Sequence, residues 1–195
     1  MKYIFTKEQY NSDYGMITYA WGPLLWHFLH IMSFNYPVNP EEYNKKNNYC
    51  RGFIQNIYYL FIRMLQYVLP CKSCRDNLVN NLNVLKFKQR KLHIMKNRHN
   101  FSKFIYNLHE TVNKMLNKTN NLTYEDIRDF YEHFRAYCSN KDKSGKKIHS
   151  GCVDLEHNSK NRIKPKVIIY FVPFSKKIKT TKIHKKCNIK CYHSK

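Results

Sequence analysis

The chain has 195 residues, 43% of them hydrophobic, and a formal net charge of +22. This length predicts one domain plus a tail, and the few glycines and prolines favour helices over turn-rich sheets. No stretch reaches the ~18 apolar residues of a membrane span, and the start lacks the apolar region of a signal peptide. We therefore expect a reducing, cytoplasmic compartment, where the seven cysteines favour catalysis or metal binding over a passive disulfide framework.

Residues 1–19 are predicted to be a lead-in segment. Helical spacing of apolar residues then predicts a helix over about 22–32, with Pro23 in its first turn, where a missing N–H costs little. The face of this helix consists of Leu25, Trp26, Leu29, His30, Ile31 and Met32.

A second helical stretch is predicted over about 41–69, after a loop marked by prolines. Pro70 interrupts it directly before Cys71, where a third helix is predicted to begin and to run to about Leu82. The apolar stripe of the second stretch is Phe53, Ile54, Ile57, Leu60, Phe61, Met64, Leu65 and Val68.

Residues 86–100 are polar and basic and are predicted to be mainly a connector. A strong helix is predicted over 101–116 from its apolar spacing. Thr123 is predicted to cap the last helix, with Asp126 three residues later as in a variant of the capping box. This helix is predicted to run to about Tyr137.

After residue 138 lysine dominates, so residues 139–195 are predicted to be a basic extension of uncertain structure. Its net charge of +13 favours an anionic partner, such as nucleic acid, an acidic protein or an acidic membrane face. A solvated, partly disordered tail has the same composition. The apolar run at 166–174 fits one strand, a docking segment or an aggregation-prone stretch.

Cys71 and Cys74 are the strongest chemical feature of the sequence. Two cysteines at this spacing close a disulfide across one helical turn, and a helix N-terminus stabilises a thiolate. Lys72 and Arg75 add positive charge nearby. The pattern therefore predicts thiol–disulfide exchange, which requires a thiolate.

Two other interpretations of this dithiol stay open, a zinc half-site and two unrelated core cysteines. Structural zinc needs two more ligands at suitable spacing. The candidate pairs, Cys138 with Cys152 and Cys187 with Cys191, do not form a second compact C-x-x-C.

The flanking helices add a constellation of rings, polar groups and charge. Trp26 and His30 lie four residues apart, as do His109 and Asn113, and Lys118 follows the later helix. A flavin nucleotide needs ring surfaces, hydrogen-bond donors and a cation, although core packing also accounts for a Trp–His pair. Asn113 stands where a zinc protease carries its second histidine, and no Rossmann or P-loop glycine motif is present.

Three ordered blocks within about residues 20–135 resemble the Erv/ALR flavin-linked sulfhydryl oxidases. Residues 21–30 (WGPLLWHFLH) resemble the family's W-x-x-L-H helix, and their Trp-Gly-Pro start is similar to members from large cytoplasmic DNA viruses. The second block is PCKSC, and the third, residues 108–118 (LHETVNKMLNK), resembles H-N-x-V-N-x-x-L-x-K. Residues 123–131 are similar to the last helix of the viral members.

This resemblance implies an all-α fold over residues 20–138, a four-helix bundle with an additional short helix, which binds FAD as a homodimer. It implies that Cys71 and Cys74 are catalytic, with Cys74 beside the flavin and Cys71 exchanging with substrate. The FAD contacts that it implies are Gly22, Trp26, His30, Cys74, His109, Asn113, Lys118 and Tyr131. The sequence departs from the family at Glu110, usually Asn, and at Phe104, often Trp.

The implied activity is the oxidation of protein thiols to disulfides, with electrons passing through the dithiol to FAD and then to oxygen, giving hydrogen peroxide. The expected partners are thiol-containing proteins, with a thioredoxin-like relay protein as one candidate, molecular oxygen and a second copy of the chain. The likeness to viral members implies a place at virus assembly sites or in the virion. No metal is expected.

The remaining cysteines have several interpretations. By the same resemblance, Cys187 and Cys191 are candidates for an electron shuttle, and Cys138 and Cys152 for a structural disulfide, with free thiols as the alternative for all four. Cys50 is predicted to be an isolated core cysteine. The rival function is a basic zinc- or nucleic-acid-binding protein without enzymatic activity, consistent with the aromatic residues between lysines in the extension.

Overall fold

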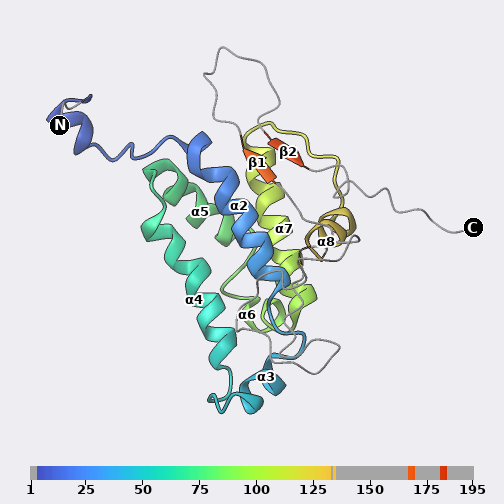
Figure 1. The fold of residues 1–195 in the computed structure, drawn as a ribbon. Helices are drawn as coiled ribbons and strands as arrows, with labels where there is room; N and C mark the ends of the chain where they lie inside the picture. Colours follow the sequence, from blue (N-terminus) through green and yellow to red (C-terminus); the bar gives the residue numbers. More distant parts are fainter. Residues whose placement is uncertain (1–3, 133, 135–166, 170–180, 184–195) are drawn as a thin grey trace, which may run out of the picture. The chain divides into compact units, whose positions relative to one another are not determined.

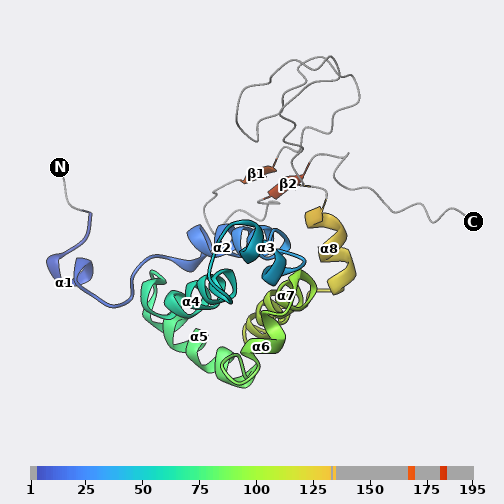
Figure 2. The ribbon, with the colours of Figure 1, turned by 90° about the horizontal axis from the view of Figure 1, so that it is seen from below.

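Four long helices surround one apolar core. α2 packs along α7, α4 packs along α5, and α5 contacts α7 (Figure 1). Figure 2 shows these helices around a common centre. Their bounds are α2 Thr18–Phe34, α4 Phe53–Val68, α5 Lys72–Val84 and α7 Arg98–Met115. The predicted all-α, four-helix bundle is confirmed.

The structure, a computed structural model, describes residues 4–132, 134, 167–169 and 181–183. Shorter elements accompany the bundle: α1 (Lys7–Tyr10), α3 (Pro40–Lys46), α6 (Lys91–Ile94), α8 (Tyr124–Glu132), β1 (Val167–Ile169) and β2 (Thr181–Ile183).

The chain divides into two compact units, residues 1–127 and 128–195. In the second unit β1 pairs with β2 in antiparallel register, with Val167 opposite Ile183. A strand, one of the three interpretations of the apolar run at 166–174, is therefore present at residues 167–169.

Local sequence signals account for most helix ends. Asn39 and Asn97 cap α3 and α7, each accepting a hydrogen bond from the backbone N–H three residues later. The predicted capping box is confirmed, because Thr123 and Asp126 bond reciprocally through side chain and backbone at 3.2 and 2.8 Å. Residue 133 and residues 135–137 of the predicted last helix lie outside the described part of the chain.

Three predicted boundaries are wrong. α2 begins at Thr18, so Pro23 lies beyond the first turn, where its missing N–H leaves one helical hydrogen bond unmade. The stretch predicted over 41–69 divides into α3 and α4, because Asn48 and Gly52, which lie between the two helices, both adopt left-handed backbone conformations, with φ of +56° and +76°. The predicted connector over 86–100 contains α6 and the first turn of α7.

The apolar stripe predicted for α4 is not the face that packs on the core. Leu65 is its only buried member, and the other buried residues of α4 are Tyr59 and Ile62. The remaining stripe is largely exposed, since α4 carries apolar residues on two faces and periodicity does not say which face is covered. The core that does form is built mainly from Leu29, Tyr36, Tyr59, Ile62, Leu65, Leu78, Leu82, Phe87, Phe101, Phe104, Ile105 and Leu108.

Candidate active site

Cys71 caps the N-terminus of α5. Its backbone is extended, and its sulfur accepts a hydrogen bond from the backbone N–H of Cys74 at 3.3 Å. The hydroxyl of Ser73 lies 3.1 Å from the same sulfur. Although burial raises the pKa of the Cys71 thiol, the hydrogen bonds from Cys74 and Ser73 outweigh it and lower the pKa to about 7. Cys71 is thus suited to react as a thiolate near neutral pH.

Cys74 lies on the first turn of α5 and differs from Cys71 in its electrostatics. Burial, and then the hydrogen bond with Cys71, raise the pKa of the Cys74 thiol. Both cysteines are free thiols in the structure. The two sulfurs therefore have unequal properties, as a relay with distinct entry and exit sulfurs requires.

The two cations beside the dithiol bind other groups and are not what lowers the pKa of Cys71. Lys72 pairs with the Asp76 carboxylate at 2.7 Å, and Arg75 donates a hydrogen bond to the Leu69 carbonyl at 2.8 Å. Hydrogen bonds, rather than these charges, lower the pKa of Cys71.

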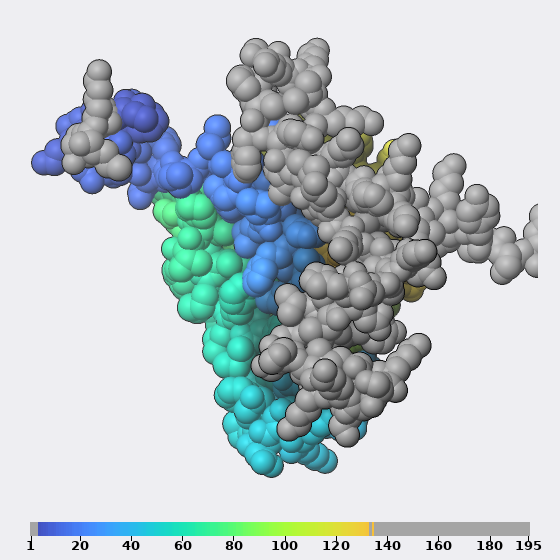
Figure 3. Space-filling model, viewed as in Figure 1, coloured from blue at the N-terminus to red at the C-terminus, as the bar shows by residue number. Residues whose placement is uncertain are grey.

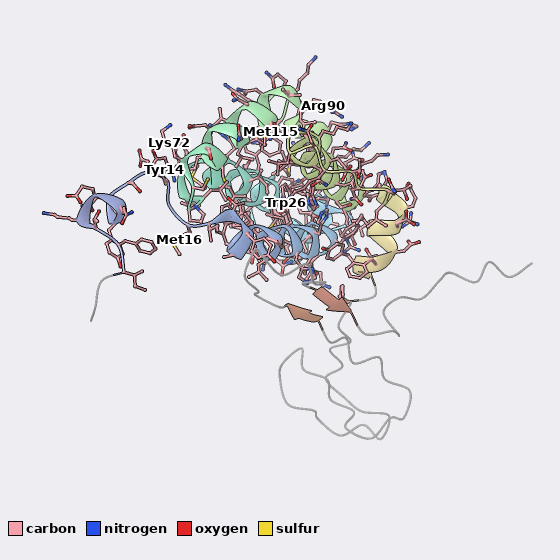
Figure 4. All side chains as sticks on the ribbon, turned by 90° about the horizontal axis from the view of Figure 1, so that it is seen from above. Tyr14, Met16, Trp26, Lys72, Arg90 and Met115 are labelled. Atoms are coloured by element: carbon pink, nitrogen blue, oxygen red, sulfur yellow. The ribbon has the colours of Figure 1, made fainter. Side chains whose placement is uncertain are left out.

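Residues 13–16, which we call the N-terminal strap, cross the start of α5. The N–H of Met16 donates to the Pro70 carbonyl at 2.6 Å, and the N–H of Lys72 donates to the Asp13 carbonyl at 3.2 Å. Figure 4 shows Tyr14 and Met16 on the same side of the molecule as Lys72. Cys71 is only 8% exposed beside this strap.

Gly15 allows the strap to lie this close. Its φ is +67°, and a Cβ at this position would lie 2.1 Å from the Pro70 carbonyl oxygen and 3.2 Å from the Cys71 Cα. Only glycine combines this backbone conformation with this approach. The sequence gives no signal for the strap, because Asp13 and Met16 lie more than fifty positions before the residues that they bond to, Lys72 and Pro70.

A ring cluster joins α2 to α7. The Trp26 indole stacks on the His109 imidazole, with centroids 4.1 Å apart and planes within 8°. His30 Nε2 lies 3.1 Å from His109 Nδ1, so one ring donates and the other accepts. Burial lowers the pKa of His30 to about 3 and that of His109 to about 4. Both imidazoles are therefore neutral at neutral pH, and Trp26 lies among the helices of the bundle (Figure 4).

The polar residues around the end of α7 are tied together. The Glu110 carboxylate accepts hydrogen bonds from the side-chain amides of Asn113 at 3.0 Å and Asn120 at 3.1 Å. The N–H of Lys118 donates to the Asn113 carbonyl at 2.8 Å, and the charge of Lys118 helps to lower the pKa of His109. Sequence reasoning did not select Glu110 and Asn120 as functional residues; the only signal was Glu110 as a departure from the family pattern.

Gly22 and Thr18 lie one helical turn apart on α2. A Cβ at Gly22 would lie 3.1 Å from the Thr18 methyl group, and the Thr18 hydroxyl lies 3.5 Å from the Cys74 sulfur. Sequence reasoning did not select Thr18, because no local pattern indicates a contact across 56 residues.

The structure therefore brings Cys71 to Cys74, and Trp26, His30 and His109 to one another. Tyr131 belongs to the second unit, and its role as a cofactor contact stays a prediction. Cys50 is exposed in the turn before α4, so its prediction as a core residue is wrong. Cys138, Cys152, Cys187 and Cys191 lie outside the described residues.

Among the described residues, no group of three or more His, Cys, Asp or Glu side chains is arranged to hold a metal ion. None of the helices in that part of the chain is long and apolar enough to cross a membrane.

The sequence pattern of the Erv1/Alr family matches residues 23–137. The chain is 32% identical over 112 residues to a protein of Acanthamoeba polyphaga mimivirus named as an FAD-linked sulfhydryl oxidase, covering 57% of this chain and 68% of the relative. It is 27% identical over 101 residues to a protein of Invertebrate iridescent virus 6 with the same type of name, covering 51% of this chain and 82% of the relative.

Proposed function

The chain belongs to the Erv1/Alr family, and on that premise we propose that it is an FAD-dependent sulfhydryl oxidase that forms disulfides in protein substrates. The observation that carries this proposal is the dithiol at the start of α5. There the Cys71 sulfur accepts the hydrogen bonds that favour a thiolate, and Cys74 follows one turn later.

In the proposed reaction a substrate thiolate attacks the Cys71 sulfur of an oxidised Cys71–Cys74 pair. The intramolecular S–S bond breaks, a mixed disulfide forms at Cys71, and Cys74 leaves as a thiolate. A second substrate thiolate then attacks the substrate sulfur of that mixed disulfide. This step releases the substrate disulfide and the Cys71 thiolate, which leaves two electrons on the pair.

The residues present fit a flavin cofactor. Trp26 and His109 offer aromatic surfaces, His30 and His109 are neutral polar rings, and Lys118 supplies a cation for a phosphate. The side-chain nitrogen of Asn81 is buried without a hydrogen-bond partner among the described residues, and Asn81 lies two turns after Cys74 on the same side of α5. A bound group with acceptor atoms would satisfy this donor.

In the proposal Gly22, Trp26, His30, His109, Asn113 and Lys118 would hold FAD, and the contact of Tyr131 with FAD stays a prediction from the sequence. When bound, FAD accepts two electrons from the dithiol and passes them to oxygen, which yields hydrogen peroxide. The protein contributes neutral imidazoles, which do not place a positive charge between the helices, and a Cys74 thiolate as the electron donor.

We also propose that the enzyme is a homodimer. The apolar side chains that α2 and α4 leave exposed form one stripe on each helix, and Phe28 of α2 meets Phe61 of α4 edge-on, with centroids 6.2 Å apart. Figure 3 shows the surface of α2 bordering that of α4. The stripe residues are Leu24, Phe28, Ile31, Ile57, Leu60, Phe61, Met64 and Val68. Such a contiguous apolar surface marks an interaction site, and a two-fold axis would cover it with its own copy.

Both named relatives come from viruses. We therefore also propose that the enzyme acts where virus particles assemble. Its proposed substrates are thiol-containing proteins, and a relay protein of the thioredoxin type is the proposed carrier between them and the enzyme. Cys187 and Cys191 as a shuttle, and the basic extension as an anion-binding segment, stay predictions about residues outside the described ones.

The proposed function is tested by colour and oxygen consumption together. The purified chain is expected to be yellow and to consume oxygen when given a small dithiol. Cys74→Ser should abolish oxygen consumption and leave the flavin absorbance intact. Cys50→Ser, which removes an exposed thiol outside the site, should change neither. Normal turnover in the Cys74 variant, or a colourless protein that retains zinc, would contradict the proposed oxidase function.

A further inference from the structure

The hydroxyl of Thr18 contacts the sulfur of Cys74. Thr18 is the first residue of α2, and its Oγ1 lies 3.5 Å from the Cys74 Sγ on the first turn of α5. Either atom donates while Cys74 is a thiol, and Thr18 is the donor once Cys74 is a thiolate. Thr18 lies before residues 23–137, so the family pattern does not include it.

Two neighbouring features fix the position of Thr18. Its methyl group packs over Gly22, where any side chain would come within 3.1 Å of it. On its other side the backbone is held by Met16, whose N–H bonds to Pro70 and whose carbonyl accepts the Trp21 indole N–H at 3.1 Å. The hydroxyl is therefore directed at Cys74 by packing and by backbone hydrogen bonds.

We propose that Thr18 is a positioning residue, whose hydroxyl donates a hydrogen bond to the Cys74 sulfur and favours its thiolate form. This inference rests on the proposed function, which requires a Cys74 thiolate at two steps. Cys74 must leave as a thiolate from the mixed disulfide, and it must then donate electrons.

Thr18 makes the larger of the two hydrogen-bond contributions that favour a Cys74 thiolate, and the Ser73 hydroxyl, which lies 3.1 Å from the Cys71 sulfur, makes the smaller one. The Cys71 sulfur already accepts the Cys74 N–H, and a Cys71 thiolate disfavours a second negative charge beside it. The nearby cations have other partners. Lys72 pairs with the Asp76 carboxylate, and the Arg75 guanidinium donates to the Leu69 carbonyl and lies 3.9 Å from the Asp13 carboxylate. Burial raises the pKa of Cys74, and the bond from Thr18 opposes that rise.

The test compares Thr18→Val, which replaces the hydroxyl by a methyl group of similar size, with Thr18→Ser, which keeps the hydroxyl and removes the methyl group. Both are made in the full chain carrying Cys71→Ser, so that Cys74 titrates without a thiol partner. Alkylation of Cys74 by iodoacetamide is followed against pH by peptide mass spectrometry. Thr18→Val should raise the alkylation midpoint by about one pH unit, about tenfold less thiolate at neutral pH. Thr18→Ser should remain near the parent value.

An unchanged midpoint in Thr18→Val overturns the proposal. An equal rise in both variants also overturns it, because packing of the methyl group would then be responsible. Thr18 is exposed, so folding should survive, and circular dichroism checks this. Should the valine variant not fold, Thr18→Ala compared with Thr18→Ser decides the same question. Alkylation needs neither flavin nor oxygen, so a failure of the proposed function would appear separately, as colourless or inactive protein.

Discussion

The indole of Trp26 and the imidazole of His109 stack face to face, 4.1 Å apart, and join α2 to α7. Trp26→Ala should remove this contact and lower the free energy of unfolding by about 2 to 3 kcal/mol, less than for a fully buried ring. Trp26→Phe keeps an aromatic face, so its free energy of unfolding should fall much less. Urea unfolding of the purified variants measures the difference, and equal losses would contradict a role for stacking.

The buried histidines should make stability depend on pH. The pKa values of His30 and His109 fall to about 3 and about 4 in the folded chain, from 6.5. Between about pH 6.5 and 4 the unfolded chain binds more protons, so stability is full above pH 6.5 and declines as the pH falls. Each histidine contributes a slope of about 1 kcal/mol per pH unit.

Urea unfolding at several pH values checks this slope. His30→Gln should flatten the decline, whereas His93→Gln, which changes an exposed histidine, should leave it unchanged. A decline that is as steep in the His30 variant as in the parent would assign the pH dependence to other groups.

Gly15→Ala should detach the strap from Pro70. The new Cβ would meet the Pro70 carbonyl oxygen at 2.1 Å, in addition to the ~1 to 2 kcal/mol cost of a left-handed backbone. Cys71 should then react several-fold faster with iodoacetamide. Gly52→Ala is the matched control, because Gly52 also has a positive φ but its Cβ would meet only Asn56 at 3.9 Å. The same acceleration in both variants would show that general strain, and not the strap, controls Cys71.

Glu110 should influence flavin retention through Asn113. Glu110→Ala removes the acceptor that holds the amides of Asn113 and Asn120, so those side chains reorient and flavin should bind several-fold more weakly. Glu110→Gln keeps a carbonyl oxygen and should retain most of the affinity. Flavin fluorescence during titration of the apoprotein measures both, and unchanged affinity in the alanine variant would remove Glu110 from the site.

The exposed stripe of α2 and α4 should determine the oligomeric state. Leu60→Glu places a charge in the stripe and should convert dimers to monomers in sedimentation experiments. Leu92→Glu is the control, because Leu92 is 88% exposed on α6, away from the stripe. A parent chain that sediments as a monomer would contradict the proposed homodimer.

Local signals in the sequence predicted local structure well. The Thr123–Asp126 capping box and the position of Cys71 at the start of a helix both depend on a few adjacent residues, and both are confirmed. Helical spacing also placed Trp26 with His30 on one helix face. Their contacts with FAD stay predictions.

The sequence did not predict features that depend on distant partners. Periodicity predicted one apolar stripe on α4, whereas the core covers Tyr59, Ile62 and Leu65 and leaves most of that stripe exposed. The strap and the Thr18–Cys74 contact each join residues more than fifty positions apart, and neither leaves a mark in local spacing.

The strap also has a kinetic consequence for any thiol that approaches Cys71. Cys71 is 8% exposed, and the strap bonds to Pro70 and Lys72 on either side of it, so we expect a bulky reactant to reach its sulfur after residues 13–16 separate from Pro70. We therefore expect the rate of mixed-disulfide formation with a protein thiol to level off at high concentration, at the rate of that local opening. Stopped-flow mixing with increasing substrate distinguishes this plateau from a rate that keeps rising linearly.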